Sequence, residues 1–144
     1  MVDPRDRGLA YGDGLFETLR VTADGSVPLW PWHLRRLLRG ARVLGLPFLP
    51  ETRYLSALEE GVAALGGKPG VVKLILTRGP GGRGYLPPSN PKPTVLWQAG
   101  PLPAWSHQLR EQGIVLGLCG EPLHPESLAG LKHLNRLPQV QARR

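Results

Sequence analysis

Cysteine is scarce in this sequence of 144 residues, which contains only Cys119. One cysteine cannot form an internal disulfide or a multi-cysteine zinc site, and we expect its side chain to be a small core residue of an apolar strand. The four histidines show no H-x-x-x-H spacing, so the sequence predicts no metal site. No apolar run approaches the ~20 residues that a membrane span needs. We therefore expect a cytoplasmic protein that binds neither a metal nor a membrane.

Acidic residues are also few, since 11 Asp and Glu stand against 18 Lys and Arg, which gives a formal net charge of +7. A basic surplus attracts phosphates, carboxylates or nucleic acid. Charge alone therefore leaves two classes open, an anion-binding enzyme and a basic nucleic-acid-binding module. Aromatic residues make up only 6% of the chain, and no signature of a nucleic-acid-binding module is present. Both observations argue against the second class.

The hydrophobic pattern predicts an α+β domain with an antiparallel sheet and two helices. Period-two alternation predicts a strand at 15–21, with Leu15, Leu19 and Val21 on one face and Phe16 on the other. Its hairpin partner is expected at 27–30, after a turn. The remaining predicted elements are helices at 33–44 and 53–65, strands at 71–78, 94–99 and 114–118, and a last helix from Pro138 to Arg144.

A loop rich in glycine and proline, at 79–93, contains a literal G-x-G-x-x-G at 79–84. In dinucleotide-binding proteins this motif opens a helix, whereas here the run Tyr85-Leu86-Pro87-Pro88 follows it. The chain has no G-K-[ST] and no G-x-S-x-G, so a P-loop is excluded and a serine hydrolase is unsupported. The loop is either a plain connection or a means of directing Arg83 and Tyr85 toward an anion.

Two further basic residues have an ordinary and a functional interpretation. Lys132 has Leu131 on one side and a largely apolar run on the other, and desolvation there would lower the pKa of its amine and favour Schiff-base chemistry. An exposed ammonium ion is the ordinary state of a lysine. Arg36 lies on the polar face of the helix predicted at 33–44, where an arginine is usually only solvated.

Four segments together resemble the class IV aminotransferase-like enzymes, which depend on pyridoxal phosphate. They follow one another in the family's order over nearly the whole chain, and the last of them is typical of the aminodeoxychorismate lyases in that family. They are Asp6–Thr18 (DRGLAYGDGLFET), His33–Leu37 (HLRRL), Thr77–Tyr85 (TRGPGGRGY) and Leu128–Leu137 (LAGLKHLNRL).

The resemblance implies a role for five residues. Lys132 matches the lysine that holds pyridoxal phosphate covalently and acts as the catalytic base. Arg36 matches the arginine that binds the cofactor phosphate. Arg83 and Tyr85 match loop positions that recognise the substrate carboxylate, and Phe16 matches an aromatic wall beside the cofactor.

The implied reaction converts the small molecule 4-amino-4-deoxychorismate to 4-aminobenzoate and pyruvate, a step of folate biosynthesis. The nearest alternative is a D-amino-acid or branched-chain aminotransferase of the same family. The resemblance also implies a homodimer, because the family's sites lie near a subunit interface, and it implies no nucleic acid.

Members of this family are about twice as long as this chain, and their second domain supplies an acidic partner for the pyridine nitrogen and backbone amides for the phosphate. We therefore expect 1–120 to form the small N-terminal α+β domain of a fold type IV enzyme. Residues 121–144 would be the lysine-bearing linker and first helix of a second domain, most of which this chain lacks. On its own, such a piece is expected to be inactive.

Overall fold

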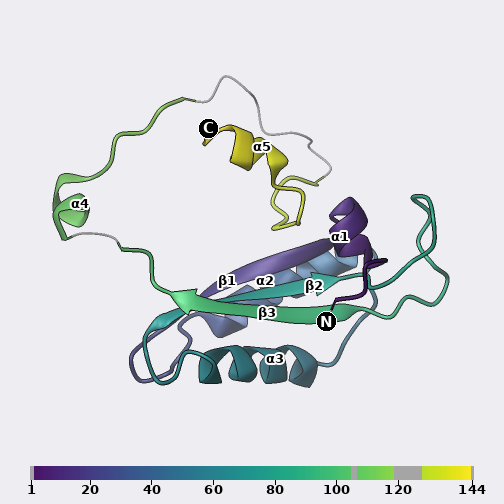
Figure 1. The fold of residues 1–144 in the computed structure, drawn as a ribbon, viewed down its shortest axis with the longest axis horizontal. Helices are drawn as coiled ribbons and strands as arrows, with labels where there is room; N and C mark the ends of the chain where they lie inside the picture. The colour runs from purple at the N-terminus through teal and green to yellow at the C-terminus, as the bar shows by residue number, and fades with distance from the viewer. Residues whose placement is uncertain (1, 105–106, 119–127, 144) are drawn as a thin grey trace.

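A computed structural model of the protein describes residues 2–104, 107–118 and 128–143. At its centre lies a three-stranded antiparallel sheet in the order β1-β2-β3 (Figure 1). Gly14 of the first strand lies opposite Thr77 of the second, and the register continues without a break along both pairs of strands. The strands are β1 (Gly14–Val21), β2 (Gly70–Thr77) and β3 (Thr94–Pro101).

Two long helices cover one face of this sheet. The helix α2 (Trp30–Val43) packs against β1, and α3 (Glu51–Ala63) packs against β2 and β3. Alternate residues of the strands point into the core between sheet and helices, as a half-buried sheet requires. The buried apolar residues are Leu15, Leu19, Val21, Leu34, Leu37, Ala41, Leu46, Tyr54, Ala57, Leu58, Val72, Leu74 and Leu76.

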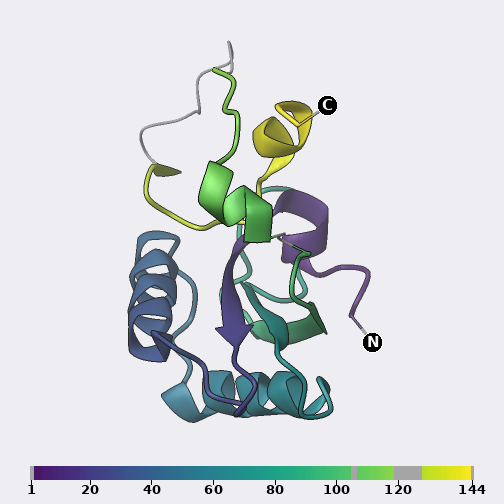
Figure 2. The same cartoon turned by 90° about the vertical axis from the view of Figure 1, so that its left-hand side faces the viewer.

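Three short helices lie outside this core, namely α1 (Arg7–Tyr11), α4 (His107–Gln112) and α5 (Leu137–Gln141). Two perpendicular views place α3 on one side of the sheet and α4 and α5 on the opposite side (Figure 2). The face that α2 and α3 leave open therefore belongs to the side on which the C-terminal segment lies.

The predicted α+β class, with an antiparallel sheet and two covering helices, is confirmed. The two long helices and three strands begin and end within three residues of their predicted bounds. The last helix is shorter than predicted, because it starts at Leu137 and ends at Gln141.

The predicted hairpin strand at 27–30 is wrong. In the structure β1 pairs with β2 instead, and the chain turns sharply at Leu29, whose φ is 64°. Trp30 already begins α2, with Pro31 in the first turn of the helix, where a proline costs no hydrogen bond. The strand-like run at 27–30 is thus the entry to a helix.

The predicted strand at 114–118 is also wrong. Residues 113–118 form neither strand nor helix, and Val115 and Leu118 are fully exposed. Alternating apolar residues form a strand only where a neighbouring strand offers backbone partners, and in the described part of the chain the sheet ends at β3. The predicted core position of Cys119, and the predicted boundary between 120 and 121, lie outside the described residues.

No helix in the described residues is both long and apolar enough for a membrane span. The described ranges also bring no three His, Cys, Asp or Glu side chains together as metal ligands.

Candidate active site

The segment that carries Lys132 lies along the free edge of β1. The Phe16 backbone N–H donates to the Lys132 carbonyl oxygen at 2.9 Å, and the Leu134 N–H donates to the Gly14 carbonyl oxygen at 3.0 Å. Between them His133 forms an antiparallel bridge with Leu15. These contacts fix Lys132 beside Phe16, although the two residues are far apart in the sequence.

Three basic side chains converge on the Phe16 ring. The Lys132 Nζ lies 4.4 Å from the ring centroid, the Lys73 Nζ lies 4.8 Å from it and the Arg136 guanidinium carbon lies 5.3 Å from it. Lys73 reaches the ring from β2, where its register partner is Thr18 on β1. An aromatic face attracts cations. Phe16 therefore lies at the centre of a cluster of three basic side chains.

The pKa of the Lys132 amine is lowered from its ordinary value. Burial makes the largest contribution, because it disfavours the charged form. The nearby charge of Glu17 acts in the opposite direction, while the positive charges of Arg36, Arg136 and Lys73 lower the pKa further. The net result is a larger fraction of neutral amine at a given pH, which is the form that attacks a carbonyl or accepts a proton.

Arg36 is held in place by a buried carboxylate. Glu17 is only 1% exposed and accepts hydrogen bonds from the Arg36 Nε at 2.7 Å and Nη2 at 2.5 Å, and a third contact joins it to the His33 Nδ1 at 2.9 Å. Burial raises the pKa of Glu17, but the contacts with Arg36 and His33 outweigh this effect and the net pKa is lowered. The pair fixes the direction of the Arg36 side chain.

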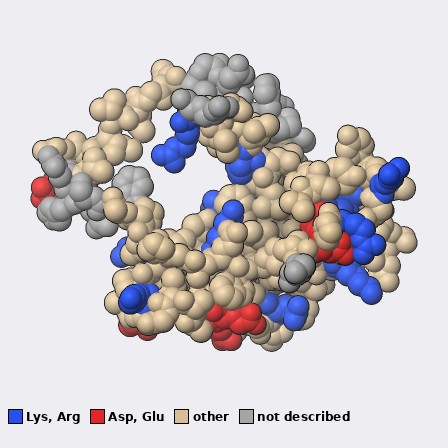
Figure 3. All heavy atoms as spheres, in the orientation of Figure 1, with Lys and Arg blue, Asp and Glu red and all other residues tan. Residues whose placement is uncertain are grey.

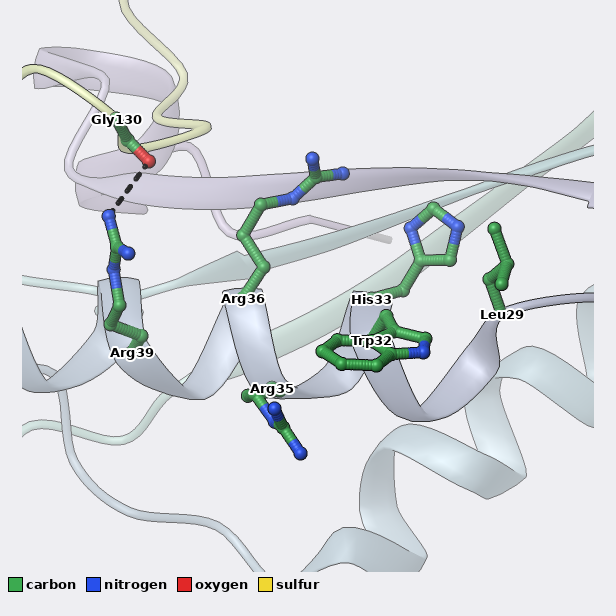
Figure 4. A pocket seen from close by; sticks show the side chains of 7 residues that line it. All are labelled: Leu29, Trp32, His33, Arg35, Arg36, Arg39 and Gly130. Atoms are coloured by element: carbon green, nitrogen blue, oxygen red, sulfur yellow. Dashed lines mark hydrogen bonds between the residues drawn. The ribbon is translucent and has the colours of Figure 1, made fainter.

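Arg36 also lines a cavity of about 390 Å³ beside α2 (Figure 4). Its side chain is 48% exposed, and its Nη1 has no hydrogen-bond partner among the described residues. Arg39, in the same wall, donates to the Gly130 carbonyl oxygen at 3.5 Å, so the cavity borders the segment that leads to Lys132. Its lining is Leu29, Trp32, His33, Arg35, Arg36, Arg39 and Gly130.

The charge of this region is positive. Basic side chains border the hollow above the sheet on the face seen in Figure 3. The Glu17 carboxylate contacts His33 and Arg36 on α2. Among the described residues, the three cations around Phe16 form no ion pair with a carboxylate. Unpaired cations at a partly buried site bind anions such as phosphate or carboxylate.

Arg83 and Tyr85 lie elsewhere, on the loop between β2 and β3. The Tyr85 side chain is 85% exposed, and its ring packs edge-to-face on Tyr11 with centroids 5.5 Å apart. Within the described chain, no hydrogen bond, ion pair or ring contact joins either loop residue to Lys132. The structure thus brings Lys132, Phe16 and Arg36 into one region and does not join the loop pair to it.

Sequence reasoning missed Lys73 and Glu17, the partner of Arg36. Lys73 reaches Phe16 only because β1 and β2 pair in this register, and Glu17 meets Arg36 and His33 only because α2 packs on β1. A pairing register is set by contacts between distant parts of the chain, so periodicity within each segment carried no signal for these residues.

A lysine amine with a lowered pKa and cations nearby suits the binding of an anionic carbonyl compound. The chain belongs to the class IV aminotransferase family, whose sequence description, Amino-transferase class IV, it matches over residues 14–144. Its fold is that of the N-terminal part of a fold type IV enzyme.

Two individual relatives within this family are similar to the chain along nearly its whole length. The aminodeoxychorismate lyase of Vibrio harveyi is 36% identical over 140 residues, which cover 96% of this chain and 50% of that protein. The crystal structure of 4-amino-4-deoxychorismate lyase from Pseudomonas aeruginosa superposes with a TM-score of 0.89 at 47% identity, covering 99% of this chain and 52% of that one. The chain thus spans about half the length of these relatives.

A third relative bears on the cofactor. A hypothetical aminotransferase from Mycobacterium tuberculosis, in its PLP-bound form, superposes with a TM-score of 0.60 at 32% identity over 72% of this chain and 35% of that one. Membership of the family and this relative together imply pyridoxal phosphate as the cofactor.

Proposed function

We propose that the protein is a pyridoxal-phosphate-dependent lyase that converts 4-amino-4-deoxychorismate to 4-aminobenzoate and pyruvate, a reaction of folate biosynthesis. The observation that carries this proposal is the position of the Lys132 amine, which lies over Phe16 with a lowered pKa and is surrounded by basic groups. The lyase names of two relatives that align along nearly the whole chain support this substrate.

The residues present fit the cofactor. Pyridoxal phosphate, when bound, supplies an aldehyde that condenses with amines and a ring that takes up electrons. The lowered pKa of the Lys132 amine suits reaction with the aldehyde, and the exposed edge of Arg36, held on its other side by Glu17, suits the phosphate. We assign Lys132 to covalent attachment and Arg36 to the phosphate.

Lys132 also acts as the base in this proposal. Once the substrate's amine has displaced Lys132 from the aldehyde carbon, the freed Nζ takes the proton from the ring carbon that bears the substrate's amino group. The ether bond to the enolpyruvyl group then breaks and the ring becomes aromatic. The departing group gains a proton and leaves as pyruvate. The Phe16 ring excludes water from the reacting amine, since the two lie 4.4 Å apart.

The substrate carries two carboxylates, which need two groups of partners. Lys73 and Arg136 lie beside Phe16, and Arg83 and Tyr85 are exposed on the loop between β2 and β3. We propose that the loop pair binds one substrate carboxylate, as the resemblance implies, and that the cations beside Phe16 bind the other.

The test is an assay of the natural protein with pyridoxal phosphate and 4-amino-4-deoxychorismate. Pyruvate and 4-aminobenzoate should form in equal amounts, and Lys132→Ala should reduce the rate by about 10³-fold or more. Borohydride should fix the cofactor on Lys132. Lys68→Ala, at an exposed lysine after α3, is the matched control and should keep the parent rate.

Two results would contradict the proposal. Amino transfer from a D- or branched-chain amino acid to 2-oxoglutarate, without release of pyruvate, would make the protein an aminotransferase. Salt-sensitive binding of DNA or RNA, without either reaction, would make it a nucleic-acid-binding module.

Three further expectations belong to the same proposal. We propose a homodimer, which sedimentation of the natural protein tests, and a cytoplasmic location, which cell fractionation tests. We also propose that 1–120 and 121–144 belong to different domains. The support for all three is the family resemblance and the sequence pattern.

A further inference from the structure

The buried guanidinium group of Arg7 forms the centre of a hydrogen-bond network at the start of α1. The residue is 4% exposed, and its Nε donates to the Asp13 carboxylate at 2.8 Å. Its other nitrogens donate to three successive backbone carbonyl oxygens, those of Gly84 at 3.1 Å, Tyr85 at 2.7 Å and Leu86 at 3.4 Å. One side chain thus satisfies three carbonyls of the loop between β2 and β3.

This loop segment contains the residues to which we assign a substrate carboxylate. Arg83 immediately precedes the three bound carbonyls, and Tyr85 is the middle residue of the three. Both side chains are exposed, while the backbone of this segment is fixed by Arg7. The Tyr11 ring reinforces the arrangement, since it lies 4.8 Å from the Arg7 guanidinium carbon and packs edge-to-face on Tyr85.

Asp13 holds Arg7 in this position. Its carboxylate also accepts two hydrogen bonds from Arg78, at 2.7 Å and 3.1 Å, and Arg78 in turn donates to the carbonyl oxygens of Leu44 and Gly45. Burial raises the pKa of Asp13, but the contacts with Arg78 and Arg7 outweigh this and the net pKa is lowered. The network therefore stays charged and anchors the loop to the body of the domain.

The residues that follow Arg7 also contact the segment that carries Lys132. The Asn135 Nδ2 donates to the Gly12 carbonyl oxygen at 3.3 Å, and the Leu134 N–H donates to Gly14. Gly12 has a φ of 66°, and a Cβ there would lie 2.2 Å from the Asn135 Oδ1, so only glycine allows this close approach. Residues 7–14 thus contact both the segment of Lys132 and the loop between β2 and β3, which we call the substrate loop.

From this geometry we infer that Arg7 is a positioning residue for the substrate loop. It sets the backbone of 84–86 and thereby the positions of Arg83 and Tyr85, the residues to which we assign a substrate carboxylate. The substrate part of this inference rests on the proposed function, whereas the fixing of the loop does not.

Two neighbouring glycines offer a matched pair of variants. A Cβ added at Gly81 would lie 2.8 Å from the Arg7 Cδ and would displace a side chain that all its hydrogen bonds hold in place. A Cβ added at Gly82 would meet no atom within 4 Å. Gly81→Ala should therefore disturb the Arg7 contacts, and Gly82→Ala should leave them intact.

Arg7→Lys provides a second, independent variant. Lysine keeps the charge but replaces the planar fork by a single ammonium group, which cannot serve Asp13 and three separate carbonyls together. Arg5→Lys is its control, because Arg5 is an exposed arginine that pairs with Asp3 and donates nothing to the loop.

The first measurement is the rate of tryptic cleavage after Arg83, which does not depend on any enzymatic activity. Gly81→Ala and Arg7→Lys should increase this rate about tenfold or more, because a released loop opens more often. Gly82→Ala and Arg5→Lys should leave it within about twofold of the parent rate. Cleavage after Arg53 of α3 reports global unfolding and should stay unchanged in all four variants.

The second measurement is the kinetics of pyruvate release by the natural protein. Gly81→Ala and Arg7→Lys should raise KM about tenfold and change kcat much less, since a displaced loop weakens substrate binding. Neither control should change either constant.

Each outcome decides a separate part of the inference. Unchanged cleavage after Arg83 in both variants, or an equal increase after Arg53, overturns the role of Arg7 in fixing the loop. Faster cleavage with an unchanged KM overturns its role in positioning substrate groups. If the parent protein releases no pyruvate, the proposed function fails, and the tryptic measurement still decides the role of Arg7.

Discussion

The Lys132 side chain shares the Phe16 ring with two residues of like charge, Lys73 and Arg136, which is unusual for a lysine. Burial and like charge both disfavour its ammonium form, and only Glu17 acts in the opposite direction. The site therefore stabilises the neutral amine and also offers positive groups to an anionic ligand. A lysine with only a structural role needs neither a stabilised neutral amine nor further positive groups around it.

Replacing a neighbouring charge tests this account. Lys73→Gln removes one positive group beside Phe16, so the pKa of Lys132 should rise toward its ordinary value and less neutral amine should be present near pH 7. NMR titration of the lysine ε-carbons would measure the change.

Lys68→Gln is the matched control, since Lys68 is exposed and does not act on the Lys132 pKa. A Lys132 pKa that falls, or stays constant, in the Lys73→Gln variant would show that the cations do not set the state of this amine.

At the level of helices and strands, periodicity within a segment predicted the elements that bury one apolar face in the core. The strand at 15–21 and the helix that includes Leu34, Leu37 and Ala41 were both found this way. The prediction failed at 27–30 and 114–118, where apolar residues have strand-like spacing but the backbone finds no strand to pair with. Pairing partners are a tertiary property, so a local pattern does not reveal them.

The site shows the same division. Motif resemblance indicated Lys132 and Arg36, and the structure places the first beside Phe16 and the second in the cavity of α2. The resemblance did not reveal the role of Glu17. This residue lies in β1 among buried leucines, on the face that the helices cover, and its carboxylate fixes the Arg36 side chain. A carboxylate in that position is stable only with its partners from α2, which no spacing within β1 could indicate.

The Glu17 contacts join β1 to α2 and predict a pH dependence of stability. Because the folded-state pKa of Glu17 is lowered, the unfolded chain binds more protons in the acid range, and stability rises with pH there. The contribution is fully present above the unfolded pKa, about 4.3, and is lost as the pH falls through the folded pKa.

Glu17→Gln should remove this contribution. At pH 7 it should lower the free energy of unfolding by about 1–3 kcal/mol, and the difference from the parent should shrink as the pH falls below about 4.3. Urea unfolding at a series of pH values measures this. Glu59→Gln, at an exposed carboxylate of α3, is the control and should stay within about 0.5 kcal/mol of the parent. A constant difference at all pH values would contradict the assignment.

Over the whole molecule, the proposed function assigns one side of the site to the described residues. The basic groups, the Phe16 wall and the cavity of α2 lie near the lysine segment, whereas the carboxylate that acts on Lys132, Glu17, is already engaged by Arg36 and His33. The resemblance implies that a second domain provides an acidic group for the cofactor ring, and the chain spans about half the length of the lyases that it matches. Binding and catalysis would then depend on both parts.

This dependence predicts that a polypeptide of residues 1–144 folds but does not turn over substrate at an enzymatic rate. With pyridoxal phosphate and 4-amino-4-deoxychorismate, it should release pyruvate at less than about 1% of the rate of the full-length Pseudomonas aeruginosa lyase, because the resemblance assigns groups that stabilise the transition state to the second domain. Circular dichroism must show folded polypeptide, so that inactivity cannot be assigned to unfolding. Turnover within about tenfold of the full-length enzyme would mean that these residues hold the whole catalytic apparatus, and the division of the site between two domains would be wrong.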